Sequence, residues 1–118
     1  MTIPYENKKN RTIKFIVDGQ IMKLDPDCDI SNLVPGTEQY LRAKFTFSPE
    51  WDGYVKAARF HSMMGREYPP RLLADGRTCL IPATALSKRS FKVSVVGKKD
   101  DQKLTTNRVA VSQNGGKT

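Results

Sequence analysis

The segment from Tyr40 to Gly53 constrains the fold of this chain more than any other. Its first half alternates strictly: Leu41, Ala43, Phe45 and Phe47 fall on one side, and Tyr40, Arg42, Lys44 and Thr46 on the other. A period of two is typical of a half-buried β-strand. A turn carrying the single tryptophan, Trp51, follows, and then a second strand-like run over residues 54–62. The sequence therefore predicts a β core, with the indole of Trp51 folded back between two sheets.

Short strand-like runs separated by turn signals make up most of the chain. Asp18-Gly19 and Asp75-Gly76 are hairpin signals, and Pro82 is suited to begin one helical turn over residues 82–86. The imperfect alternation of 54–62 favours a β-bulge at Ala57-Ala58, and the polar residues 97–104 indicate a charged turn. Strands are expected at residues 12–17, 20–24, 38–47, 54–62, 66–73, 77–81, 90–96 and 106–112, with 66–73 on an edge because of its prolines.

This pattern predicts one all-β domain, a β-sandwich (immunoglobulin-like or a small barrel) of seven or eight short strands with one short helical turn. The domain is expected to span residues 12–112, between a flexible basic arm at 1–11 and a frayed tail at 113–118. A length of 118 residues allows a single core, and a hydrophobic content of 38% with a mean hydropathy of -0.52 makes that core thin.

The charge balance favours acidic partners. Twenty Lys and Arg against 12 Asp and Glu give a formal net charge of +8, which suits nucleic acid, anionic polymers or acidic protein surfaces without selecting among them. No apolar stretch is long enough to span a membrane, and no secretion signal opens the sequence, so we expect a cytoplasmic protein at synthesis. Cys28 and Cys79 lie far apart in the sequence and are expected to be reduced thiols.

No motif in the sequence indicates catalysis. His61 is the single histidine, and no Gly-x-Ser-x-Gly elbow or phosphate-binding loop accompanies it. One histidine and two scattered cysteines do not supply a zinc site. Asp25, Asp27 and Asp29 alternate as in a calcium loop, but the glycine and glutamate that complete such a loop are missing. We therefore expect a protein that is not an enzyme and that holds no metal or cofactor.

Basic residues occupy outward positions on several predicted strands. If those strands were neighbours, Arg42, Lys44, Lys92 and Arg108 would form one positive stripe, with Lys98 and Lys99 at its end. A binder of single-stranded nucleic acid also needs aromatic side chains for base stacking, and Tyr40 is the only outward aromatic residue on the strand of Arg42. The sequence leaves open whether this face binds a partner or is simply solvated.

The run Phe45–Gly53, followed by Lys56–Phe60, resembles a motif in small proteins encoded by phages and prophages of Gram-positive bacteria, which are similar to tail or baseplate β-sandwich domains. The resemblance continues through Cys79–Pro82, Ala85-Leu86, Phe91–Gly97 and Thr106–Val111, and so covers about residues 38–112. Its most specific part is the Trp-Asp-Gly turn.

The resemblance implies a structural role for the motif and no catalytic residue. A core hairpin is expected, in which the strand before Trp51 pairs with the strand after it. Its implied setting is a virion component of the tail or baseplate, in the virion or the host cytoplasm, with phage or host proteins or further copies of itself as partners. The expected core residues are Phe45, Phe47, Trp51, Gly53, Phe60, Phe91, Val93 and Val109.

Two other functions stay open at this point. The positive charge exceeds what such a domain leads us to expect, which favours a phage-encoded inhibitor of a host defence nuclease that binds through its positive face, or a nucleic-acid binder. A carbohydrate-binding module that uses Trp51 or Tyr54 is a further alternative.

Overall fold

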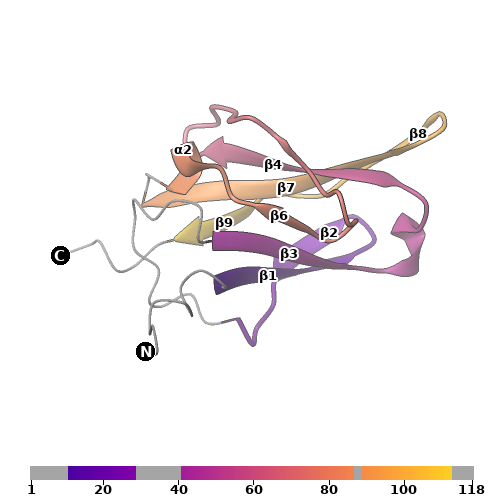
Figure 1. The fold of residues 1–118 in the computed structure, drawn as a ribbon, viewed down its shortest axis with the longest axis horizontal. Helices are drawn as coiled ribbons and strands as arrows, with labels where there is room; N and C mark the ends of the chain where they lie inside the picture. The colour runs from indigo at the N-terminus through magenta and orange to yellow at the C-terminus, as the bar shows by residue number, and fades with distance from the viewer. Residues whose placement is uncertain (1–10, 29–40, 87–88, 113–118) are drawn as a thin grey trace, which may run out of the picture.

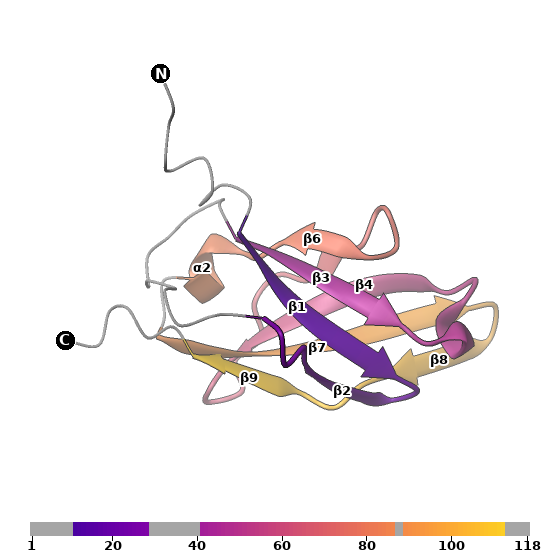
Figure 2. The same ribbon diagram turned by 90° about the horizontal axis from the view of Figure 1, so that it is seen from below.

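The computed structural model describes residues 11–28, 41–86 and 89–112, and these form two β-sheets packed face to face (Figures 1 and 2). The prediction of an all-β sandwich is confirmed. The predicted arm up to residue 10, the tail from residue 113 and Tyr40 lie outside the described residues.

The first sheet has four strands and contains one parallel pair. In spatial order the strands are β2 (Ile21–Leu24), β1 (Arg11–Asp18), β3 (Leu41–Phe47) and β6 (Thr78–Leu80). Strand β1 pairs in parallel with β3 over seven residues and antiparallel with β2, and β6 pairs antiparallel with β3.

The second sheet has five strands: β5 (Arg71–Leu72), β4 (Val55–Ser62), β7 (Ser90–Lys99), β8 (Gln102–Thr105) and β9 (Val109–Ser112). They are arranged around β7, the longest of them. One side of β7 pairs with β4, and the other side pairs with β8 and β9, which follow each other along it. The short helix α2 (Ala83–Leu86) leads from β6 into this sheet.

The predicted core hairpin is wrong, because β3 and β4 belong to different sheets. The 3-10 turn η1 (Pro49–Trp51) carries the chain from one sheet to the other. The physical reason is that each of these strands is paired along its whole length with another strand. Strand β3 pairs with β1 over seven residues, and β4 pairs with β7 over eight. The turn therefore spans the two layers, where the indole of Trp51 fills the space between them.

Trp51 is fully buried and held on several sides. Its Nε1–H donates a hydrogen bond of 2.7 Å to the carbonyl oxygen of Gly19, in the β1–β2 turn. Its ring centroid lies 5.2 Å from that of Phe47 and 6.0 Å from that of Tyr54, and its edge faces the backbone of Gly97 in β7. The side chain thus joins the two sheets through packing and one partly buried hydrogen bond.

The other residues expected in the core differ in how deeply they are buried. Phe45, Phe60, Phe91 and Val93 are buried, whereas Phe47 and Val109 are half-buried at the margin of the core. Gly53 is exposed and serves the turn instead, where its φ of 83° suits glycine.

Three local predictions also need correction. The charged turn predicted at 97–104 is the end of the β7–β8 hairpin. Most side chains there are polar and exposed, so the sequence shows no alternation of apolar and polar residues. The strand predicted over 66–73 is reduced to β5 and a single bridge at Glu67, since Pro69 and Pro70 cannot donate ladder hydrogen bonds. The register of β4 on β7 runs without a break, so there is no bulge at Ala57-Ala58.

Candidate interaction surface

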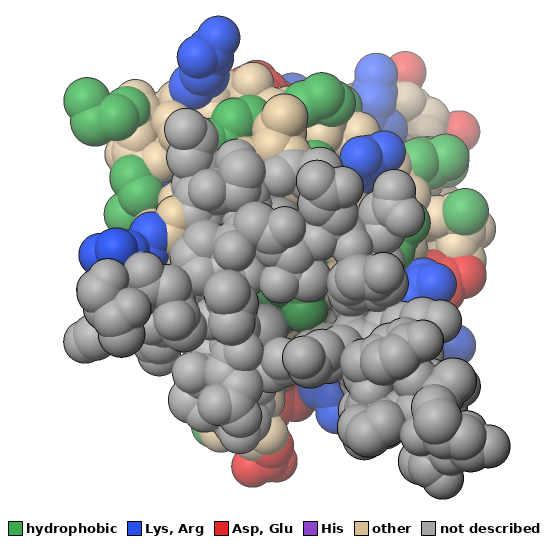
Figure 3. Space-filling model, turned by 60° about the vertical axis from the view of Figure 1, so that its left-hand side comes forward, with side chains coloured by type: hydrophobic (Ala, Val, Ile, Leu, Met, Phe, Trp, Pro, Cys, Tyr) green, Lys and Arg blue, Asp and Glu red, His purple; other side chains and the backbone are tan. Residues whose placement is uncertain are grey.

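The basic residues predicted to form one stripe lie on two opposite faces of the sandwich. Arg42 and Lys44 project from β3 of the four-stranded sheet, whereas Lys92 projects from β7 of the five-stranded sheet. Arg108 immediately precedes β9, and Lys98 and Lys99 end β7, again in the five-stranded sheet. The predicted stripe is therefore wrong, because alternation shows that a residue points outward but not which sheet carries it. Figure 3 shows Lys and Arg side chains at several separate places around one end of the molecule.

Acidic groups lie close to the basic residues of the five-stranded sheet. The guanidinium of Arg59 forms an ion pair of 2.7 Å with Glu67, the one ion pair found within the described residues. Asp100 and Asp101 form the turn between Lys99 and β8. The positive charge of this sheet is thus partly balanced where it occurs.

His61 lies in the same sheet and is almost completely buried, with 2% of its surface exposed. Its Nδ1 atom has no hydrogen-bond partner. Burial, and then the positive charge of Arg108, hold the pKa of His61 below its usual value, so the ring is neutral at neutral pH. Its Nδ1 therefore makes no hydrogen bond to a carboxylate, the contact that orients the histidine of a Ser-His-Asp triad.

The outer face of the four-stranded sheet carries a more concentrated set of cations. Four exposed residues alternate outward on its three longer strands, and we call them the cationic face: Lys14, Lys23, Arg42 and Lys44. Lys14 and Lys44 are direct partners in the parallel β1–β3 register, and Lys23 pairs with Ile16, two residues along β1 from Lys14. Adjacent strands are about 4.8 Å apart and residues two apart on a strand about 7 Å apart, so all four charges lie within or near a Debye length of a neighbour.

No ion pair joins the cationic face to an acidic side chain anywhere in the described part of the chain. Asp18 ends β1, and a carboxylate oxygen of Asp25 accepts a hydrogen bond of 2.9 Å from the backbone N–H of Asp27. Like charges at adjacent positions of neighbouring strands repel each other, with a strength that solvent and salt reduce at exposed positions. The pair of Lys14 and Lys44 is therefore a cost to folding that no neighbouring acid offsets by an ion pair.

Sequence reasoning identified Arg42 and Lys44 but missed Lys14 and Lys23. Both missed residues alternate outward in predicted strands, so their exposure could be inferred. What could not be inferred was the parallel pairing of β1 with β3, which brings Lys14 beside Lys44 although the two residues are thirty positions apart in the sequence.

The described outward positions of the four-stranded sheet hold no aromatic side chain. Phe15 and Phe45 point into the core, and Phe47 packs against its margin. The remaining outward residues are aliphatic, hydroxyl or charged: Thr12, Ile16, Asp18, Ile21, Thr46, Thr78 and Leu80. The face thus lacks, in this part of the chain, the rings on which single-stranded bases stack.

The two cysteines are free thiols in different surroundings. Cys28 is half-buried, and its sulfur accepts a hydrogen bond from the backbone N–H of Lys14 at 3.3 Å. Cys79 is buried in β6, and that burial raises its pKa to about 12. The described residues contain no cluster of three or more His, Cys, Asp or Glu that could hold a metal ion.

Comparisons with known proteins leave the family open. No protein-family model matches this sequence, and no curated protein matches it. None of the helices in the described segments has the length and hydrophobicity needed to traverse a lipid bilayer.

Proposed function

We propose that this protein is a non-enzymatic interaction domain that binds an acidic surface of a partner protein through its cationic face. The supporting observation is the direct opposition of Lys14 and Lys44, with Arg42 and Lys23 beside them and no ion-paired acid. Such an arrangement lowers the stability of the free protein, and an acidic partner converts the same charges into favourable contacts.

A protein partner fits this surface better than nucleic acid does. Threonine and aliphatic side chains surround the four cations, and no aromatic side chain stands among the described outward residues. Base stacking contributes much of the binding of single strands, so a face without rings depends on charge alone. Charge with small polar and aliphatic neighbours is suited to carboxylates on a folded protein.

The resemblance of the tryptophan-turn motif to phage tail and baseplate domains suggests the biological setting. We place the protein as a phage-encoded virion component that acts in assembly or attachment, working with phage or host proteins. The alternative is a phage-encoded inhibitor of a host defence nuclease that binds through its positive face, for which the charge favours an acidic region of that nuclease. Analysis of purified phage particles distinguishes the two functions, because a virion component co-purifies with the particles and an inhibitor is absent from them.

Binding of a labelled poly-L-glutamate peptide, followed by fluorescence anisotropy, tests the proposed surface. The variant Lys44→Glu should weaken binding about tenfold. It replaces the attraction between a lysine and the glutamates of the peptide by a repulsion, at the position beside Lys14. The matched control is Lys103→Glu, which makes the same change of net charge at an exposed position of β8 in the other sheet. Equal losses in the two variants would show that net charge, and not this face, determines binding.

A single-stranded oligonucleotide is the second ligand in the same assay. If the cationic face makes specific contacts with carboxylates, the oligonucleotide should bind more weakly than a poly-L-glutamate of equal charge. Non-specific binding of phosphate groups depends instead on charge and salt concentration. Oligonucleotide binding that is tighter than peptide binding and depends on Lys44 would favour the nucleic-acid alternative instead.

A further inference from the structure

The two lateral edges of the sandwich differ in how they are closed. At one edge, the side chain of Asn107 reaches from the β8–β9 connection to β2. Its Oδ1 accepts a hydrogen bond of 2.6 Å from the backbone N–H of Met22, and its Nδ2 donates one of 2.9 Å to the backbone oxygen of Met22. Asn107 thus satisfies both outward backbone groups of Met22 as a neighbouring strand would.

The opposite edge, formed by β5 and β6, has no such closure in the described chain. The N–H of Phe45 bonds to the oxygen of Arg77, and the N–H of Ile81 bonds to the oxygen of Leu41. Because hydrogen-bonded pairs alternate along an antiparallel ladder, the N–H and C=O of Leu80 point away from β3 toward the open edge. The outward N–H of Thr78 is already bonded to Asp75, so Leu80 supplies the unpaired backbone groups of β6, and such groups on an edge strand are a template for another strand.

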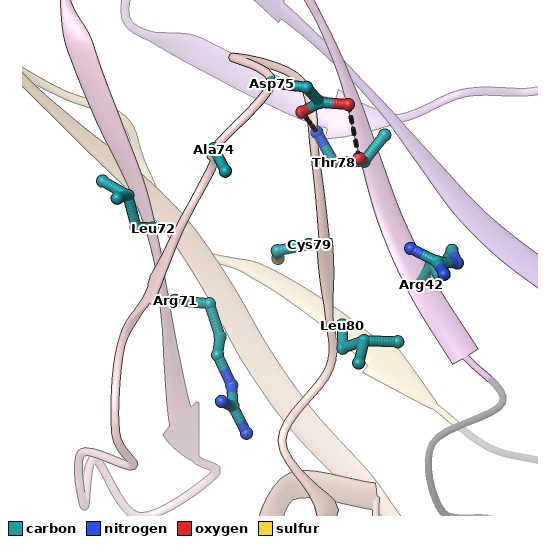
Figure 4. A pocket seen from close by; sticks show the side chains of 8 residues that line it. All are labelled: Arg42, Arg71, Leu72, Ala74, Asp75, Thr78, Cys79 and Leu80. Atoms are coloured by element: carbon teal, nitrogen blue, oxygen red, sulfur yellow. Dashed lines mark hydrogen bonds between the residues drawn. The ribbon is translucent and has the colours of Figure 1, made fainter.

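A groove of about 400 Å³ separates β5 from β6 at this edge (Figure 4). Figure 4 shows the side chain of Cys79 directed between the two strands, with Arg71 on β5 and Leu80 on β6. Leu72 and Leu80, which also line the groove, are 62% and 40% exposed. Large aliphatic side chains so exposed beside unpaired backbone groups indicate a surface suited to an extended, partly apolar ligand.

The charges around the groove favour an acidic ligand. Arg42 and Arg71 line it from different sheets, and neither forms an ion pair with a described acidic residue. The one carboxylate in the lining, Asp75, accepts hydrogen bonds from the backbone N–H groups of Arg77 and Thr78 and from the Thr78 hydroxyl. Those bonds lower the pKa of Asp75 to about 2 and direct its oxygens into its own turn.

We propose that β6 is a docking edge to which an extended segment of a partner protein, containing both aliphatic and acidic residues, adds as a further strand. Backbone groups of the segment pair with the N–H and C=O of Leu80. An aliphatic side chain enters the groove over Cys79, and carboxylates meet Arg71 or Arg42, according to the face from which they project. This edge adjoins the cationic face and shares Arg42 with it. Strand pairing at Leu80 and the contact with Arg71 do not depend on the other cations of that face, so the inference stands whether or not that face binds a partner.

A capped hexapeptide of sequence Val-Glu-Glu-Val-Val-Glu tests the proposal, because it places valine and glutamate on both faces of a strand. We expect its addition to slow hydrogen exchange of the Leu80 amide about tenfold, measured by NMR, with little change at Met22 on the closed edge. The same peptide with lysine in place of glutamate should give no protection. A peptide N-methylated at every amide, which has no N–H to offer on either edge, should also fail.

Two variants locate the contacts. Leu80→Pro removes the N–H offered to the ligand but none of the hydrogen bonds to β3, so the fold should persist. Since this variant has no amide hydrogen at position 80, its binding is followed by fluorescence anisotropy of the labelled hexapeptide, and that binding should be lost. Arg71→Ala should lower the affinity for the hexapeptide about fivefold. Lys103→Ala, which removes the same charge from β8, should leave that affinity unchanged. If Leu80→Pro fails to fold, the N-methylated peptide still tests strand addition.

Several results would overturn the proposal. They are equal protection by the lysine peptide, undiminished binding of the N-methylated peptide, and protection that appears only at residues 14, 23 and 44. Protection of Leu80 without peptide, accompanied by a dimer in light scattering, would assign the edge to a second copy of this chain instead.

Discussion

Replacing Gly97 by alanine should destabilise the protein through one identifiable contact. Gly97 lies in β7 beneath the indole, and a Cβ built there would stand 2.8 Å from Cζ3 and 3.1 Å from Cε3 of Trp51, and 3.3 Å from Cβ of Tyr54. Carbon atoms normally pack at about 3.5–4.0 Å. The ring has little freedom to retreat, because its Nε1–H is bonded to Gly19 and its far side packs on Phe47.

The magnitude follows from two opposing effects. Overpacking a well-filled core costs about 1–3 kcal/mol, whereas replacing glycine by alanine restricts the unfolded chain and returns about 0.4–1 kcal/mol. We expect the free energy of unfolding of Gly97→Ala to fall by about 1–2 kcal/mol, which corresponds to about 4–12 °C in Tm for a domain of this size.

Urea denaturation followed by circular dichroism measures this change, and a double-mutant cycle with Trp51→Phe assigns its cause. Trp51→Phe alone should cost about 2–3 kcal/mol, since it removes the hydrogen bond to Gly19 and leaves a cavity. In the double variant the alanine methyl enters that cavity, so the combined loss should be at least about 1 kcal/mol smaller than the sum. Additive losses, or a Gly97→Ala variant as stable as the parent, would refute the account of Trp51 as a fixed wedge between the sheets.

Three further changes test the closed edge, the buried thiol and the buried histidine. Asn107→Ala should lower the free energy of unfolding by about 1–3 kcal/mol in urea, because both backbone groups of Met22 lose their partner. Maleimide should modify Cys28 before Cys79 in the native protein, as read by mass spectrometry, since burial raises the pKa of Cys79 to about 12. The lowered pKa of His61 means that the folded state favours the neutral ring, so its contribution to stability is complete above the unfolded pKa of 6.5 and is lost as pH falls below it. Thermal melts between about pH 7.5 and 5.5 should show this loss, and His61→Gln should reduce it.

The sequence predicted which residues point inward better than it predicted which strands meet. Alternation correctly placed Leu41, Ala43 and Phe45 on the core side of β3, because that pattern reflects burial of one face and is local. Strand pairing depends instead on contacts between distant segments. The parallel β1–β3 pair and the passage of the chain between sheets at Trp51 therefore left no local signal.

For the candidate surfaces too, outward positions could be predicted from the sequence but the neighbouring strands could not. Arg42 and Lys44 were identified from their outward positions, but their neighbours on the cationic face depend on the β1–β3 register. The groove could not be predicted, because Arg71 and Leu80 come from strands of two and three residues in different sheets. Strands so short carry almost no periodic pattern.

The most direct test of the cationic face is an NMR titration of the isotopically labelled protein with poly-L-glutamate. We predict the largest amide shift changes at Lys14, Lys23, Arg42 and Lys44, on the outer face of the four-stranded sheet. Changes centred instead on Lys92, Lys98 and Arg108, in the five-stranded sheet, would contradict the proposed binding surface.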